Sequence, residues 1–220
     1  MKYRIGQVVK VKDGVLCPDD PDFDLSGWQG RVMDIDEDDE GPTVGIEWDS
    51  ITLNEIPKSY IEKSEEEGVS WAEIYLSDSD IEPAKPRDSE KDVDKVREKL
   101  ENLFFWLHLG DEGKRIQAVV NSGESNDDFE VMKSWGKHLE KTLQFPFEAI
   151  VKYRARGPLN EKDRLKVFKI EIVDDSYGVI VGCRKESKRC DFPLVDLDPV
   201  NKKKPNAQHI HDYCTWFANR

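Results

Sequence analysis

The chain has 220 residues and a formal net charge of −13, and 10% of its residues are aromatic, including six Trp. This aromatic content argues against a disordered chain. No apolar run reaches the roughly 20 residues that a membrane-spanning helix requires. The length favours one large or two small domains.

The N-terminus lacks the apolar core of a signal peptide, and the four cysteines show no CxxC spacing. We therefore expect reduced thiols, a cytoplasmic protein and no membrane partner.

The charge is unevenly distributed along the chain. Residues 1–90 carry 24 acidic and 9 basic side chains, a net charge of −15, whereas residues 91–220 carry 22 acidic and 24 basic ones. Phosphate backbones would be repelled by the first half, and the second half has no concentrated basic stripe. We therefore expect no nucleic-acid partner.

The N-terminal third has the pattern of short strands. Residues 3–12 alternate apolar and polar side chains, and after a turn-rich loop at 18–24 two more strands follow at 27–33 and 43–48. Between these two strands, the acidic residues 34–41 end in Gly-Pro, which is typical of a hairpin tip. Short strands at this spacing predict a small β-barrel.

This pattern, with Gly-Trp-x-Gly-x-Val at 27–32 and Ile-x-Trp-Asp-Ser at 46–50, resembles SH3-like barrels built around KOW-type strands. The segments Ile56–Ile61 and Trp71–Leu76 would complete such a barrel. The first domain is therefore expected at residues 1–84, followed by a charged, proline-containing linker at 85–91.

Residues 92–220 are expected to form an α+β domain. Apolar residues recur at three- and four-residue spacing in three segments near 93–107, 116–123 and 129–139, which indicates helices. Four segments rich in β-formers follow, at 148–153, 165–172, 177–184 and 191–195, and a closing helix is expected at 207–217. The prediction is helices followed by a small SH3-like barrel or antiparallel sheet.

The acidic hairpin tip is a candidate metal site. Asp34, Asp36 and Asp38 could supply the oxygen ligands that Ca²⁺ prefers. An EF-hand is excluded, because Asp39 stands where the turn glycine belongs and Gly45 where the bidentate Glu belongs. The alternative is a solvated tip that favours solubility. The loop with Asp at 19, 20, 22 and 24 leaves the same two alternatives open.

Three separated motifs in the second domain carry a sharper resemblance. Residues 135–151 (WGKHLEKTLQFPFEAIV), 193–197 (PLVDL) and 213–219 (YCTWFAN) are similar to the cyanobacterial-type calcium-binding protein family. The resemblance implies a small α+β protein with an SH3-like barrel that binds Ca²⁺ without EF-hands. The ligands that it implies are Glu140, Glu148, Asp174, Asp175, Asp196 and Asp198.

Other constellations are weaker. His211 and Cys214 are three apart and could share a transition metal on a helix. Cys183 and Cys190 are spaced to face each other across a hairpin, as a reduced pair by default. No phosphate-binding loop, nucleophile elbow or HExxH motif is present, so we expect a non-catalytic protein.

The hypothesis from the sequence is a Ca²⁺-binding buffer or sensor. The alternative is a metal-free binding protein with a protein partner. It would be either an SH3-like interaction module or an acidic inhibitor of a basic protein. In the module, an exposed groove would be built from the aromatic side chains Trp28, Trp48, Tyr60 and Trp71.

Overall fold

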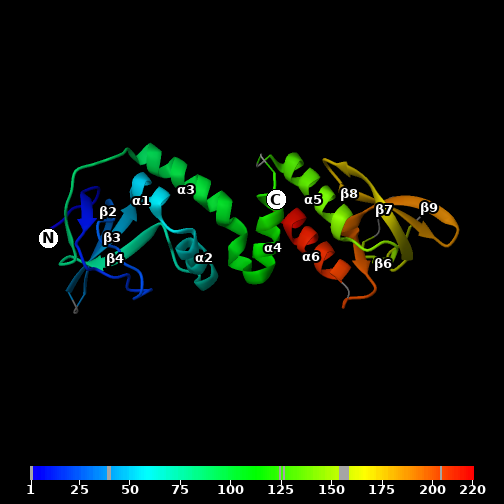
Figure 1. The fold of residues 1–220 in the computed structure, drawn as a ribbon, viewed down its shortest axis with the longest axis horizontal. Coiled ribbons are helices and arrows are strands. Elements are labelled where there is room, and N and C mark those ends of the chain that lie inside the picture. Colours follow the sequence, from blue (N-terminus) through cyan, green and yellow to red (C-terminus); the bar gives the residue numbers. More distant parts are fainter. Residues whose placement is uncertain (1, 39–40, 124, 126, 154–158, 204) are drawn as a thin grey trace. The chain divides into compact units, whose positions relative to one another are not determined.

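Two five-stranded antiparallel sheets, each accompanied by helices, make up the computed structural model of the chain (Figure 1). The structure describes residues 2–38, 41–123, 125, 127–153, 159–203 and 205–220, and it describes only the backbone of Glu37 and Asp38. The chain divides into two compact units, Met1–His108 and Leu109–Arg220. The α+β class predicted from the sequence is therefore confirmed.

The first unit is built around the sheet with strand order β4-β3-β2-β1-β5. Its strands are β1 (Val8–Val11), β2 (Gln29–Asp38), β3 (Gly41–Trp48), β4 (Glu73–Ser77) and β5 (Ile81–Pro83). β2 and β3 form the predicted hairpin, in which Gly30 lies opposite Trp48. One face of the sheet contributes Val9, Val11, Val32, Val44 and Ile46 to the core.

Two short helices, α1 (Ser50–Glu55) and α2 (Lys58–Glu67), connect β3 to β4. The strand predicted at 56–61 is therefore wrong. Tyr60, Ile61 and Ser64 are buried, which is the spacing of one helix face. Gly68 ends α2 in the left-handed conformation, φ 70°, that favours glycine at this position.

Helix α3 (Glu90–Phe104) packs on α1 and α2 and completes the core of the first unit. Ser89 is the N-cap residue of α3 and forms a capping box with Asp92. Val93 and Phe104 are buried in the core of the first unit. The composition of the chain placed this helix in the second domain, whereas the compact units separate at 108/109. The domain boundaries at 84 and 92, with the linker between them, stay a prediction.

The second unit contains three long helices and the sheet with order β10-β6-β7-β8-β9. The helices are α4 (Gly110–Val120), α5 (Asp128–Thr142) and α6 (Pro205–Ala218). The strands are β6 (Phe147–Val151), β7 (Arg164–Asp174), β8 (Gly178–Lys185), β9 (Lys188–Pro193) and β10 (Leu197–Pro199). Two 3-10 helices complete the chain, η1 (Phe105–Leu109) and η2 (Leu194–Asp196). Met132, Trp135 and Leu139 of α5 are fully buried and join Tyr213 and Trp216 of α6 in the core.

The barrel expected in the first domain is not formed in the described part of the chain, and of the two alternatives for the second domain the antiparallel sheet is the one that forms. Both sheets are open, since β4 and β5 do not pair with each other and neither do β9 and β10. In the first unit, helices α1 and α2 occupy the stretch that was expected to supply a further strand. Among the described residues, no helix is both long and apolar enough to cross a membrane.

Candidate functional site

Strands β6 and β10 present carboxylates on one face of the second sheet. β10 pairs with β6 so that Asp198 lies opposite Ile150. Ala149 and Leu197 are fully buried. Because side chains alternate along a strand, Glu148 and Asp198 lie on the opposite, outward face. They are diagonal neighbours, a relationship that places Cβ atoms roughly 7 Å apart.

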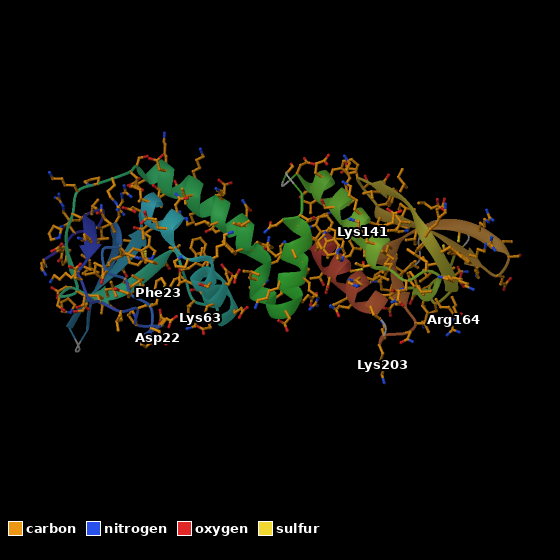
Figure 2. The ribbon with its side chains drawn as sticks, in the orientation of Figure 1. Asp22, Phe23, Lys63, Lys141, Arg164 and Lys203 are labelled. Atoms are coloured by element: carbon orange, nitrogen blue, oxygen red, sulfur yellow. The ribbon has the colours of Figure 1, made fainter. Side chains whose placement is uncertain are left out.

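Each of these two carboxylates has a basic counter-ion. Asp198 forms an ion pair with Lys202, which follows it by four residues. Arg164 stands at the start of β7 (Figure 2), and its guanidinium lies 4.0 Å from the Glu148 carboxylate. All four side chains are more than a third exposed, so these pairs hold the carboxylates weakly.

Asp196 differs from its neighbours. It ends η2, and its backbone carbonyl accepts a hydrogen bond of 2.8 Å from the Lys152 N–H. Its side chain is half-buried, and the carboxylate forms no hydrogen bond or ion pair with any described residue. Burial raises the pKa of Asp196, and the positive charge of Lys152 only partly opposes this effect. A cation beside it would offset the cost of burying this charge.

A hollow of about 530 Å³ lies between β10 and α6, and of the three carboxylates Asp198 lines it. It is lined by Asp198, Lys152 and Lys202, together with His211 and Cys214 of α6. The Lys152 Nζ lies 3.9 Å from the Cys214 Sγ. Burial raises the pKa of Cys214, Lys152 lowers it, and Asp196 and Asp198 raise it. The site therefore mixes oxygen ligands with lysines.

Asp174, Asp175 and Glu140 lie elsewhere in the second unit. Asp174 ends β7, and its Oδ1 accepts 2.9 Å hydrogen bonds from the N–H groups of Ser176 and Tyr177, which shapes the β7–β8 turn. Asp175 in that turn and Glu140 on α5 are exposed. Since β7 has 11 residues, its two ends are about 30 Å apart along the strand. The structure thus does not bring the β7–β8 turn and the β6–β10 carboxylates together.

The predicted carboxylates of the first unit lie on strand β2. Asp34 and Asp36 are exposed, and the Asp34 Oδ1 accepts 2.9 Å from the Ile35 N–H. The Tyr75 hydroxyl donates to the Asp34 Oδ2 at 3.4 Å. The side chain of Asp38 lies outside the described residues.

The acidic loop before β2 is stabilised by its own contacts. Asp20 forms a 2.8 Å ion pair with Lys63 of α2. The Asp24 Oδ1 accepts hydrogen bonds from the backbone N–H and the hydroxyl of Ser26. Two of the four loop carboxylates, those of Asp20 and Asp24, therefore have partners within the protein.

The donor chemistry of the β6–β10 face fits calcium, since carboxylate oxygens are its preferred ligands. The arrangement is incomplete: among the described residues, no group of three or more His, Cys, Asp or Glu side chains is placed to hold a metal ion. Lys202 and Arg164 occupy the positions beside two of the three carboxylates. The sequence analysis missed both residues, although the spacing of four between Asp198 and Lys202 was a readable signal.

The aromatic residues expected to form a groove belong to the core instead. Trp48, Tyr60 and Trp71 are at most 8% exposed. Tyr60 stacks on Phe23 with ring centroids 4.3 Å apart, and Trp28 packs edge-on against Trp48. These aromatic contacts within the core of the first unit explain the burial better than a binding groove does.

Comparisons with known proteins concern the second unit. A family model described as calcium binding, that of CcbP, matches residues 114–217. Two solved structures are similar. One is titled a calcium binding protein in the calcium-binding form, and it shows 21% sequence identity and a TM-score of 0.40. This match covers 49% of the present chain and 90% of the matched chain. The other, the crystal structure of Anabaena CcbP, shows 22% sequence identity and a TM-score of 0.41, and the match covers 49% of the present chain and 89% of the matched chain.

No curated protein matches. The resemblance predicted for the C-terminal region is thus confirmed, whereas the SH3-like resemblance of the first unit stays a prediction.

Proposed function

We propose that this protein binds Ca²⁺ without catalysing a reaction, with Asp196, Asp198 and Glu148 as its principal ligands. The observation that carries the proposal is the half-buried carboxylate of Asp196, which has no hydrogen bond or ion pair among the described residues. It lies beside a second carboxylate within the segment that matches the calcium-binding family. Partial burial of a carboxylate without a hydrogen bond or ion pair costs free energy, and a bound cation would offset that cost.

The chain's own residues would exchange partners on binding. Lys202 would leave Asp198, and Arg164 would leave Glu148. Both counter-ions are long, exposed side chains, so their release into solvent recovers rotamer freedom. Calcium supplies two positive charges and accepts six to eight oxygen ligands. Because a divalent ion must displace two cations, the affinity is expected to suit a buffer or sensor better than a permanent structural site.

The other predicted ligands enter the proposal as secondary sites. Glu140, Asp174 and Asp175 lie away from the β6–β10 face, and Asp34, Asp36 and Asp38 belong to the first unit. Exposed carboxylates in water gain little from a single ion unless several converge. We therefore expect these residues to contribute only weak binding at millimolar Ca²⁺.

A calorimetric Ca²⁺ titration of the full chain at physiological ionic strength, with Mg²⁺ as control, tests the proposal. The double variant Asp196→Asn/Asp198→Asn keeps side-chain size and removes two charges. It should weaken binding by about tenfold or more, which corresponds to about 1.4 kcal/mol. The matched control Asp34→Asn/Asp36→Asn should bind as the parent does. The absence of saturable heat in the parent at millimolar Ca²⁺ would refute calcium binding. Loss of binding only in the control would move the site to β2.

The first unit supports a second candidate function, an interaction module for a basic protein. β4 is an edge strand of its sheet, and it carries Tyr75, which is 48% exposed beside Asp34. An edge strand can accept another strand, and acidic side chains would steer a basic one towards it. Association with a basic partner that weakens with salt, and that Glu73→Lys/Asp34→Lys abolishes, would support this candidate.

A further inference from the structure

Two thiols of the β8–β9 hairpin are in contact. Cys183 on β8 lies directly opposite Cys190 on β9, and their Sγ atoms are 3.2 Å apart. The Cys183 thiol also donates to the Cys190 carbonyl at 3.1 Å. Opposite residues of an antiparallel pair have Cα atoms about 4.5 to 5.5 Å apart. This spacing lies within the range that a disulfide spans without backbone movement.

We propose that Cys183 and Cys190 are a redox modification site, at which hydrogen peroxide converts the two thiols into a disulfide that a dithiol reductant reverses. The other two cysteines have different neighbours. Cys17 in the first unit contacts the Tyr60 hydroxyl at 3.5 Å, and Cys214 lies beside Lys152. Neither contact offers a second sulfur.

The surroundings of the pair indicate which thiol reacts first. Cys183 is buried at 3% exposure, and burial together with the Cys190 thiol raises its pKa. Cys190 is half-buried. Both cysteines line a surface pocket of about 270 Å³, called the dent below, together with Phe168, Arg184 and Arg189. A small oxidant that enters this dent reaches the half-buried Cys190 more readily than the buried Cys183. Cys190 is therefore the attacking residue and Cys183 the resolving one.

The chemistry balances with the peroxide as the only co-reactant. The Cys190 thiolate attacks one peroxide oxygen, the O–O bond breaks, and the leaving hydroxide takes up a proton to become water. The resulting sulfenic acid is attacked by the Cys183 sulfur. The S–S bond forms, the S–O bond breaks, and the hydroxide released takes the Cys183 proton. Two thiols are oxidised, one peroxide is reduced, and two waters are formed.

The hairpin sequence gives an unambiguous test. Arg184, Lys185, Lys188 and Arg189 lie between the two cysteines, so trypsin separates them into different peptides. The full chain, first reduced, is treated with hydrogen peroxide, alkylated and digested without reductant. We expect the intact mass to fall by two hydrogen atoms and the Cys183 and Cys190 peptides to be joined. Dithiothreitol should separate them and restore four alkylatable thiols.

Matched variants assign the reaction to this pair. Cys17→Ser/Cys214→Ser should form the linked peptides as the parent does, whereas Cys190→Ser and Cys183→Ala should not. Cys190→Ser removes a half-buried group and so tests the site without opening the core. Unlinked peptides in the oxidised parent would overturn the proposal. So would a loss of two hydrogens that persists in Cys190→Ser, or conversion of Cys190 to the sulfinic acid while Cys183 stays reduced.

Discussion

Arg87 holds Asp49 with two hydrogen bonds, both 2.8 Å long, from its Nε and Nη2 atoms. Asp49 is 2% exposed, and it also caps helix α1 by accepting from the Thr52 N–H at 2.8 Å. Asp88, the residue after Arg87, accepts hydrogen bonds from the Arg31 guanidinium and from the Ser50 N–H. These contacts attach Arg87 and Asp88, within the predicted linker, to the N-terminus of α1.

Arg87→Ala should destabilise the first unit by about 2 kcal/mol, because it leaves a buried carboxylate without its partner. Arg87→Lys keeps the charge but loses the two-pronged geometry, so an intermediate loss is expected. Urea unfolding measures both. Lys85→Ala, which changes an exposed side chain of the same segment, is the control. Equal midpoints for Arg87→Ala and Lys85→Ala would mean that the contact between Arg87 and Asp49 does not stabilise the first unit.

Two glycines test the register of β2 against β3 and of β3 against β4. A Cβ at Gly30 would lie 2.2 Å from the backbone oxygen of Glu47, which cannot move without breaking the ladder. A Cβ at Gly45 would meet the ring of Tyr75 at 2.9 Å, and that exposed side chain can turn away. Gly30→Ala should cost about 3 kcal/mol and Gly45→Ala about 1 kcal/mol. Thermal unfolding of both variants compares them, and the reverse ranking would contradict the register.

His138 should make the second unit less stable in mild acid. Burial lowers the pKa of His138 below 6.5, with the His209 ring and Lys141 acting in the same direction and Asp212 opposing them. Below pH 6.5 the unfolded chain therefore takes up a proton that the folded chain resists. The stability is fully present above the unfolded pKa of 6.5 and falls as the pH drops towards the lower folded pKa.

The pH effect is measured by urea unfolding at pH 7.5 and 5.5, followed by tryptophan fluorescence. His138→Gln should reduce the difference between the two pH values. His211→Gln, which changes a side chain 68% exposed, should preserve it. The prediction is wrong if the His138→Gln variant keeps the full difference in unfolding free energy between pH 7.5 and pH 5.5.

Removing the counter-ion of Asp198 should strengthen calcium binding. Lys202→Met keeps the length of the side chain and deletes the charge that competes for the carboxylate. An exposed ion pair contributes about 0.7 kcal/mol, so the affinity should rise roughly threefold. Lys203→Met, which deletes a charge from the lining of the same hollow, controls for net charge. Equal gains in both variants would indicate a general field effect and not a direct competition at Asp198.

The sequence by itself determined most of the secondary structure, since periodicity reports which side of an element is buried. Helices α3, α5 and α6 and strands β2, β3, β6, β7 and β8 were all predictable in this way. Helix α2 was not, because Ile56, Tyr60 and Ile61 are too few apolar residues to separate a helix from a strand. The three motifs around Trp135, Pro193 and Tyr213 indicated the calcium-binding resemblance, and the family match confirms it for residues 114–217.

Only the tertiary structure decided how the charged residues are grouped. Glu148 and Asp198 are 50 residues apart in sequence and become neighbours through the pairing of β6 with β10. The length of β7 separates both from Asp174. Likewise, Asp49 and Arg87 meet only because the segment before α3 returns to the start of α1. Charge–charge contacts depend on strand register and chain reversal, and the packing of the whole core sets both. Local apolar spacing, in contrast, depends on the backbone geometry of a single element.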